Sequence, residues 1–262
     1  MYTQAKKRFG QHFLKDKHIA ERICDALNGA IEYDNVLEIG PGHGVLTQFL
    51  YPRFADSLYL VEIDRDLIQG LKENFPIISG HIYGQDFLEM DLSAIGAGQM
   101  AIIGNFPYNI SSQILFKLVE NHSKIPLLVG MYQKEVAQRV AAKPGNKIYG
   151  LISAWVQAFY DTEILFTVNE GSFSSPPTVK SAVIRLVRKE SVPDCNHKLL
   201  LQVIKAAFNQ RRKTLRNALS AYKDRFDKIE DATVLNQRAE ELGHEDFIRL
   251  AKTFVLNRDL LD

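Results

Sequence analysis

The sequence predicts an α/β fold: an open, mostly parallel sheet with helices on both faces, followed by a small all-helical C-terminal domain. First, short apolar runs of strand length alternate with segments of helical periodicity through about residue 190, as in sheets whose strands are joined by helices. Second, no strand-like run follows this region. Third, a glycine-rich turn comes directly after the first strand run, which is where open parallel sheets bind ligands.

The spacing of apolar residues predicts the individual elements. A helix with one buried side is expected over 18–30, and further helices over 65–73 and 110–121. Residues 131–139 are interpreted as a strand end that enters a helix. The predicted strands, of which the last two are candidates for antiparallel pairing, are 36–39, 58–63, 81–83, 100–105, 125–132, 164–168 and 181–187.

A domain boundary is predicted near residue 192. Residues 191–197, SVPDCNH, are polar and contain a proline, as linkers often do. We therefore expect a sheet domain with a basic N-terminal arm over 1–191 and a helical domain over 192–262. Amphipathic helices of the second domain are predicted in the segments LLLQVIKAAF, RNALSAY and DFIRLAKTFVL.

The composition is that of a globular protein, with 262 residues, 46% of them hydrophobic. Cys24 and Cys195 stand far apart, and no residues show metal-ligand spacing, so neither a disulfide framework nor a metal site is expected. No apolar run reaches the roughly 20 residues of a membrane span, and the opening residues lack a secretory signal. We expect a cytoplasmic protein without membrane contact.

Charge is unevenly distributed, although the net charge is only +1. Residues 1–17 hold five basic and one acidic residue, residues 198–225 hold eight and one, and residues 226–262 hold five and nine. Basic segments of this kind suit a phosphate-rich partner. The near-neutral total therefore does not exclude nucleic acid.

The segment VLEIGPGHGVLT, 36–47, predicts a ligand site at the end of a strand. Its glycines allow close backbone approach, and the helix that follows offers free N–H groups. Val45 stands where a dinucleotide fingerprint needs glycine, and no Gly-Lys-Ser/Thr follows, so both phosphate-binding motifs are disfavoured. Glu62 ends the second strand run, and Asp86 follows the third.

This arrangement resembles the S-adenosylmethionine site of Rossmann-like methyltransferases. In that resemblance the amino acid part of the cofactor lies over the glycine turn, Glu62 accepts hydrogen bonds from both ribose hydroxyls, and Asp86 accepts from the adenine amino group. A carboxylate suits two hydroxyl donors. The alternative is a tight turn with two surface acids nearby.

The segment NFPY, 105–108, follows the fourth strand run and suggests an amine acceptor. The adenine amine is a poor nucleophile because its lone pair is delocalised into the ring. The side-chain carbonyl of Asn105 and a main-chain carbonyl near Phe106 are expected to accept its N–H groups, while Pro107 stiffens the turn and Tyr108 stacks on the base. No strong general base is required.

The pattern Asn/Asp/Ser-Pro-Pro-Tyr/Phe is typical of amino-methylating enzymes, and here Phe106 stands at its second position. Four residues alone also match an ordinary turn. An adenine within a helix must be extruded or already unpaired, and aromatic faces offset that cost. Phe173 is a candidate for the second face of such a sandwich.

Eight segments together resemble the KsgA family of ribosomal RNA adenine dimethyltransferases, which is related to the Erm enzymes. They span nearly the whole chain and are 7–14, 36–47, Glu62, 84–87, 105–111, 131–139, the Phe173 segment and 208–217. The resemblance implies transfer of two methyl groups from S-adenosylmethionine to N6 of each of two neighbouring adenosines near the 3′ end of 16S rRNA in the small ribosomal subunit. It also implies a part in ribosome biogenesis, and a monomer.

The resemblance also implies roles for single residues. The implied cofactor-binding residues are Gln11, His12, Leu14, Gly40, Glu62, Asp86 and Asn105. The implied catalytic residues are Asn105, Pro107, Tyr108 and Phe173. The chain departs from the family pattern at Phe9, where leucine is commoner, and at Ser175 and Thr178, where proline and lysine are expected.

The segment FNQRRKTLRN, 208–217, resembles the start of the family's rRNA-binding C-terminal domain. Basic side chains contact phosphates, and the apolar residues among them seat the helices. The alternative is a solvated helix end. The predicted RNA-binding residues are Arg211, Arg212, Lys213 and Arg216.

Two rival functions remain open. The first keeps the cofactor but changes the acceptor to a DNA adenine, a protein amide or another rRNA adenine, as in the Erm enzymes. The second is a non-catalytic ribosome assembly or RNA-binding factor on the same scaffold. The intact glycine turn and NFPY segment disfavour the second as the sole function.

Overall fold

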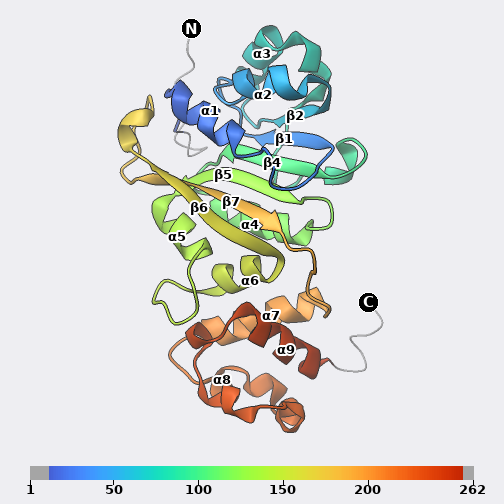
Figure 1. The fold of residues 1–262 in the computed structure, drawn as a ribbon, viewed down its shortest axis with the longest axis vertical. Coiled ribbons are helices and arrows are strands. Elements are labelled where there is room, and N and C mark those ends of the chain that lie inside the picture. Colours follow the sequence, from blue (N-terminus) through green and yellow to red (C-terminus); the bar gives the residue numbers. More distant parts are fainter. Residues whose placement is uncertain (1–11, 256–262) are drawn as a thin grey trace. The chain divides into compact units, whose positions relative to one another are not determined.

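The computed structural model describes residues 12–255 and contains, in this range, a seven-stranded sheet in the order β3-β2-β1-β4-β5-β7-β6 (Figure 1). The pairs between β3 and β5 are parallel, whereas β7 runs antiparallel to β5. The strands are β1 (Asn35–Ile39), β2 (Leu58–Val61), β3 (Ile82–Tyr83), β4 (Met100–Asn105), β5 (Leu127–Gln133), β6 (Tyr160–Val168) and β7 (Ser181–Arg188).

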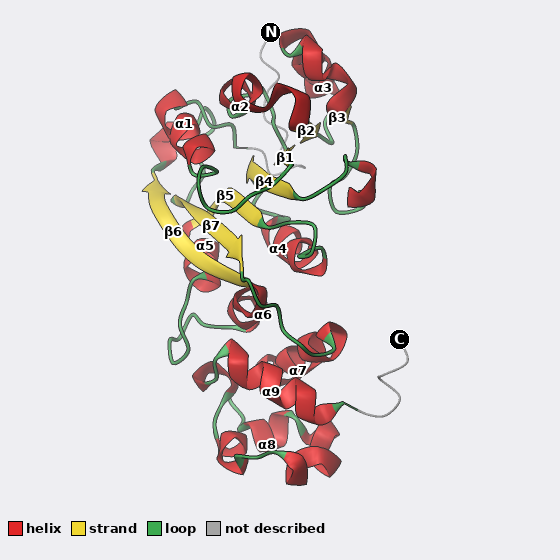
Figure 2. Cartoon of the chain, turned by 45° about the vertical axis from the view of Figure 1, so that its right-hand side comes forward, coloured by secondary structure: helices red, strands yellow, loops and turns green. Residues whose placement is uncertain are grey.

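Helices cover both faces of this sheet, as predicted. Every residue of β1 is buried, which requires cover on both sides. Figures 1 and 2 place α1, α2 and α3 on one face and α4 on the other. The helices of this part of the chain are α1 (Lys17–Asp25), α2 (Thr47–Phe54), α3 (Arg65–Asn74), α4 (Ser111–Glu120) and α5 (Lys134–Val140).

Most predicted elements are confirmed, with differences at their ends. Helices α3 and α4 match the predicted 65–73 and 110–121 within one residue, and β5 leads directly into α5. Helix α1 ends at Asp25, short of the predicted residue 30. The N–H groups of Leu27 and Asn28 donate only three residues back, to Cys24 and Asp25, and the turn ends at Gly29 with φ of +69°. Strand β6 begins at Tyr160 rather than at residue 164.

The chain divides into two compact units, Met1–Ala137 with Asp161–Arg188, and Gln138–Tyr160 with Lys189–Asp262. The junction at 188/189 lies close to the boundary predicted near 192. The segment 138–160 differs from the prediction, which assigned it to the sheet domain. It carries α6 (Leu151–Phe159), whose apolar surface packs against helices of the second unit.

The second unit is helical, as predicted. Its further helices are α7 (His197–Asn209), α8 (Leu215–Ala218) and α9 (His244–Phe254). The predicted helix over RNALSAY is shorter than expected, because the chain continues after α8 as a 3-10 segment, Ser220–Lys228. There the ring of Tyr222 stacks on Phe254, with 4.8 Å between the centroids. Trp155 of α6 is buried.

Candidate active site

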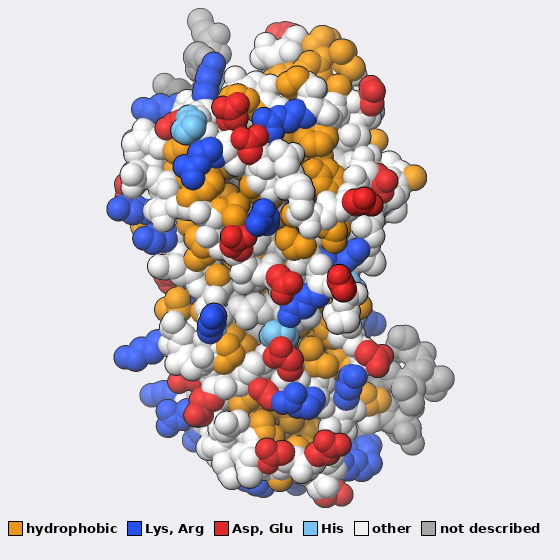
Figure 3. Space-filling view, in the orientation of Figure 1, with side chains coloured by type: hydrophobic (Ala, Val, Ile, Leu, Met, Phe, Trp, Pro, Cys, Tyr) orange, Lys and Arg blue, Asp and Glu red, His pale blue; other side chains and the backbone are white. Residues whose placement is uncertain are grey.

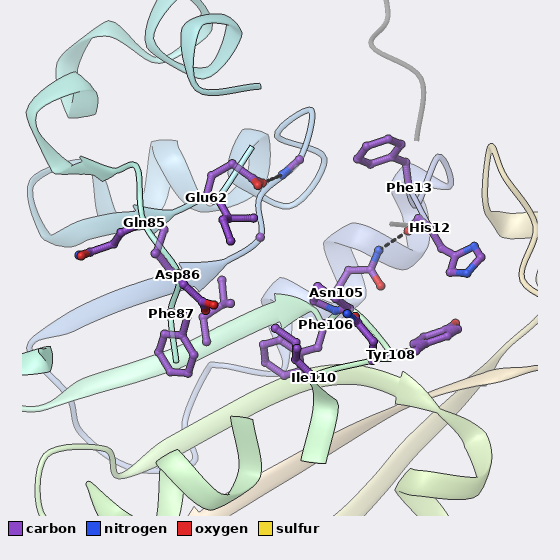
Figure 4. A pocket seen from close by; sticks show the side chains of 17 residues that line it. His12, Phe13, Glu62, Gln85, Asp86, Phe87, Asn105, Phe106, Tyr108 and Ile110 are labelled. Carbon is purple, nitrogen blue, oxygen red and sulfur yellow. Dashed lines mark hydrogen bonds between the residues drawn. The ribbon is translucent and has the colours of Figure 1, made fainter. Parts of the chain in front are cut away.

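A cavity of about 250 Å³ lies at the carboxyl ends of β1, β2 and β4 (Figure 4). Parallel strands bring their carboxyl ends to one edge of the sheet, so residues far apart in the sequence meet there. The cavity also takes in the loop after β3 and the start of the described chain. Of the predicted site residues, those that line it are His12, Gly40, Glu62, Asp86, Asn105, Pro107 and Tyr108.

The glycine turn presents bare backbone to the cavity. Gly40 and Gly42 have φ of +65° and +59°, a region that glycine adopts without strain. A Cβ atom added to Gly40 would meet no protein atom within 4 Å. The space in front of Gly40 is therefore open to a ligand that contacts the main chain.

Glu62 is 4% exposed, and main-chain donors hold its carboxylate. The N–H of Asp64 donates to Oε1 at 2.9 Å, and the N–H of Gly42 donates to Oε2 at 3.1 Å. Burial raises the pKa of Glu62, and these hydrogen bonds oppose that shift. Each carboxylate oxygen has two lone pairs, so both oxygens retain acceptor capacity for the two hydroxyls of a ribose.

Glu38 lies beneath the glycine turn and was given no role by the sequence analysis. Its Oε2 accepts a hydrogen bond of 2.7 Å from Oγ1 of Thr47, which ties β1 to the first residue of α2 across the turn. Burial raises the pKa of Glu38 to about 8, and the Thr47 hydrogen bond opposes the rise. The carboxyl group therefore retains its proton near neutral pH in the folded chain.

This shift predicts a pH dependence of folding stability. Between the ordinary glutamate pKa of about 4.3 and the raised value, the folded state holds a proton that the unfolded state has lost. The contribution of Glu38 to the free energy of unfolding therefore falls as pH rises through this window. Glu38→Gln removes this contribution, so its stability relative to the wild type should increase from pH 5 to pH 8 by at least about 1 kcal/mol.

Urea unfolding of both proteins at the two pH values measures the difference. The exposed Glu120→Gln serves as the control, and its stability relative to the wild type should not change with pH. A Glu38→Gln protein whose stability runs parallel to the wild type from pH 5 to pH 8 would contradict the prediction.

Asn105 is oriented by the N-terminal segment. Its Nδ2 donates a hydrogen bond of 2.7 Å to the main-chain oxygen of His12, drawn as a dashed line in Figure 4. The side-chain carbonyl oxygen is left to accept a hydrogen bond from a ligand. The His12 ring in turn lies 5.1 Å from the Tyr108 ring, between centroids. Gln11, the other predicted residue of this segment, lies outside the described residues.

Tyr108 is held by a residue that the sequence analysis missed. Its hydroxyl lies 2.6 Å from Oγ of Ser181, the buried first residue of β7. Burial raises the pKa of Tyr108, so the phenol stays protonated at neutral pH. No local signal marks Ser181, because its position depends on the antiparallel register in which it pairs with Gln133.

The surroundings of Phe106 account for a phenylalanine at the second position of the NFPY motif. A Cβ atom added to Gly104 or to Gly130 would lie 2.7 Å or 2.0 Å from the Phe106 ring. The ring therefore packs directly onto the backbone of β4 and β5. This packing anchors the turn that carries Asn105 and Tyr108.

A sequence profile described as ribosomal RNA adenine dimethylase matches residues 2–255. The chain belongs to this family. It is 49% identical over 249 residues to a protein of Cytophaga hutchinsonii, with 95% of this chain and 96% of that protein covered. It is 48% identical over 249 residues to one of Parabacteroides distasonis, with 95% and 93% covered. Both are named ribosomal RNA small subunit methyltransferase A.

Solved structures agree with the fold. A dimethyladenosine transferase from Plasmodium falciparum superposes with a TM-score of 0.78 and 26% identity, covering 91% of this chain and 96% of that one. The 23S rRNA methyltransferase ErmE superposes with a TM-score of 0.66 and 22% identity, covering 92% and 99%. The predicted Rossmann-like methyltransferase sheet is therefore confirmed.

Phe173 was predicted to stack on the substrate base, but the structure places it elsewhere. Its side chain is 0% exposed, belongs to the hydrophobic core and does not line the cavity. An isolated antiparallel bridge pairs Phe173 with Leu14, and the N–H of Ser174 donates to the main-chain oxygen of Phe13 at 2.9 Å. In this conformation neither face of the Phe173 ring is available to a base.

Leu14, predicted to bind the cofactor, is likewise buried in the core. It lines a second cavity that shares the glycine turn and Asn105 with the first. Its role in cofactor binding stays a prediction.

The predicted RNA-binding residues fall into two groups. Arg211 Nε lies 2.5 Å from Oε2 of Glu240, and its NH2 donates to the main-chain oxygen of Lys147. Arg211 thus fixes a loop within the second unit. The other predicted residues, Arg212, Lys213 and Arg216, are exposed. On the face that Figure 3 shows, basic side chains lie among acidic ones.

Residues 12–255 contain neither a membrane span nor a cluster of metal-ligating side chains. No helix in this range is long and apolar enough to span a bilayer. The same residues contain no group of three or more His, Cys, Asp or Glu side chains placed to hold a metal ion.

Proposed function

We propose that the protein uses S-adenosylmethionine to dimethylate N6 of two adjacent adenosines near the 3′ end of 16S rRNA in the small ribosomal subunit. The observation that carries this proposal is that Asn105 and Tyr108 share one cavity with Glu62 and Asp86, in a chain of the ribosomal RNA adenine dimethylase family. The protein acts in the cytoplasm, as a monomer, and takes part in ribosome biogenesis.

The cavity fits the cofactor. The open backbone at Gly40 suits its amino acid part, and Glu62 offers two oxygens to the ribose hydroxyls. Asp86 Oδ1 accepts from the N–H of Leu88 at 2.8 Å, and its carboxylate keeps acceptor capacity for the adenine amino group. Ile63 and Phe87 also line the cavity and offer apolar surface to the base. When bound, S-adenosylmethionine supplies an electrophilic methyl group.

The residues at the other side of the cavity orient the acceptor. The side-chain oxygen of Asn105 and the main-chain oxygen of Phe106 accept the two N–H groups of the adenine amine, which favours the pyramidal nitrogen of the transition state. Tyr108, fixed through Ser181, provides a stacking face. The methylated ammonium is acidic enough to release its proton to water, so no general base is needed.

Methyl transfer to isolated ribosomal subunits tests this function. Small subunits from cells that lack adenine dimethylation are incubated with the protein and labelled S-adenosylmethionine, and the modified bases are mapped. Two methyl groups on each of two adjacent 3′-terminal adenosines would support the proposal. No incorporation by a protein that binds the cofactor would refute it, and would favour another acceptor or an assembly role without catalysis.

The exposed basic residues of the second unit should contribute to subunit binding through phosphate contacts. We expect joint replacement of Arg212, Lys213 and Arg216 by alanine to weaken binding. The slope of log K against log salt should become shallower by about 2, because each lost phosphate contact removes roughly 0.7–0.9 of slope.

Filter binding of labelled small subunits at several salt concentrations measures the slope. The matched control replaces three exposed basic residues elsewhere in the second unit, Lys198, Lys223 and Lys228, by alanine. Equal slopes for the two triple variants would show that the predicted residues are ordinary solvated surface.

A further inference from the structure

Helix α4 connects the acceptor side of the cavity to the loop on the opposite side. The helix starts directly after the NFPY turn, and Oγ of Ser111 donates to the main-chain oxygen of Tyr108 at 3.0 Å. Ile110 lines the cavity. Lys117 follows seven residues later and so lies on the same face of the helix, two turns away.

The ammonium group of Lys117 reaches the loop that carries Asp86. Its Nζ donates to the main-chain oxygens of Leu88 at 2.9 Å and Met90 at 2.5 Å. It also lies 5.1 Å from the centroid of the Phe87 ring. Both Asp86 and Phe87 line the cavity.

The loop after β3, residues 84–91, makes few hydrogen bonds within itself. Its internal main-chain bonds are two turn contacts of 3.2 Å, from Glu89 to Asp86 and from Met90 to Phe87. The main chain of Leu88 links the side chains of Asp86 and Lys117. The N–H of Leu88 donates to Asp86 Oδ1, and its carbonyl accepts from Lys117.

The electrostatics agree with this geometry. Partial burial lowers the pKa of Lys117, and the negative charge of Asp86 opposes the shift. The ammonium is therefore within electrostatic reach of the carboxylate that faces the cavity, although the two groups do not pair directly.

We propose that Lys117 is a positioning residue for recognition of the cofactor's adenine. Through Leu88 and Phe87 it holds the Asp86 carboxylate and the apolar wall in place, and it couples this loop to the helix that begins at the acceptor turn. The inference rests on the proposed function, because it assumes that the adenine of S-adenosylmethionine binds beside Asp86.

Calorimetric titration with S-adenosylhomocysteine tests the inference. Lys117→Met should weaken binding about tenfold, since two charge-assisted hydrogen bonds to the loop are lost. The analogue whose base is purine, without the 6-amino group, should lose less than about threefold, because Asp86 makes no hydrogen bond to it. Lys117→Arg, which retains the charge and the donors, should restore most of the affinity for S-adenosylhomocysteine.

Lys124→Met is the matched control. Its Nζ donates to the main-chain oxygen of Leu92 at 2.5 Å, beyond the residues that line the cavity. It should lower the melting temperature without changing cofactor affinity. If Lys117→Met does not fold, Lys117→Gln carries the same expectation, because its shorter side chain loses at least one of the two hydrogen bonds.

The outcomes separate the inference from the proposed function. Wild-type affinity in Lys117→Met, or equal losses for S-adenosylhomocysteine and the purine analogue, would overturn the positioning role while the wild type still binds the cofactor product. A wild-type protein that binds neither ligand would overturn both the role of Lys117 and the proposed function.

Discussion

Replacement of Asn105 by alanine is expected to reduce methyl transfer at least about a hundredfold while cofactor affinity changes by less than about threefold. In the proposed mechanism the side-chain oxygen of Asn105 accepts a hydrogen bond from the acceptor amine, and this bond strengthens as the nitrogen becomes pyramidal. Its loss therefore raises the barrier of the chemical step. The residues proposed to hold most of the cofactor, namely the glycine turn, Glu62 and Asp86, line the same cavity and are left in place by the replacement.

Single-turnover methylation of small subunits measures the effect on the chemical step, and calorimetry with S-adenosylhomocysteine measures affinity. Gln113→Ala, an exposed amide on α4, is the control and should be fully active. Because Asn105 also donates to the main-chain oxygen of His12, the melting temperature of each variant is needed as well. A fully active Asn105→Ala would remove this residue from the mechanism.

Glu62→Ala is expected to weaken cofactor binding by about a hundredfold or more. In the proposed binding mode two ribose hydroxyls lose their acceptor, and the N–H groups of Gly42 and Asp64 lose the carboxylate to which they donate. Unsatisfied buried donors destabilise the glycine turn itself, so the loss combines missing contacts with a displaced backbone. The same changes should lower the melting temperature.

Glu62→Gln separates these effects, because it retains one acceptor oxygen but places an amide against one of the two main-chain donors. We expect its affinity to lie between those of the wild type and Glu62→Ala. Asp56→Ala, an exposed acid at the opposite end of β2, controls for the loss of negative charge and should bind normally. Unchanged affinity in both Glu62 variants would refute the ribose assignment.

The sequence predicts the cavity well because its signals are local. The glycine turn, Glu62, Asp86 and NFPY each follow a short apolar run. Once these runs form parallel strands, their carboxyl ends must meet at one edge. The alternation of strands and helices and these four groups of residues therefore predict the site without any tertiary contact.

The sequence does not predict whether a given side chain is exposed to the site or packed against the rest of the fold. Phe173 was expected beside a base, but pairing of its segment with residues 13–15 turns the ring into the core. Arg211 was predicted to contact phosphate; it pairs with Glu240 and keeps part of its side chain exposed, so its role in RNA binding stays a prediction. The type of an aromatic or basic side chain shows which contacts it could make, but its neighbours in the fold decide whether the side chain is accessible to a ligand.

The sequence by itself determined the class of fold, the family and the residue types of the site, because hydrophobic periodicity and motif spacing are properties of short segments. Only the tertiary structure decided that Ser181 holds Tyr108, that Glu38 retains a proton and that Lys117 reaches the Asp86 loop. These contacts join segments distant in the chain. Their partners follow from strand register and from burial, which no local pattern encodes.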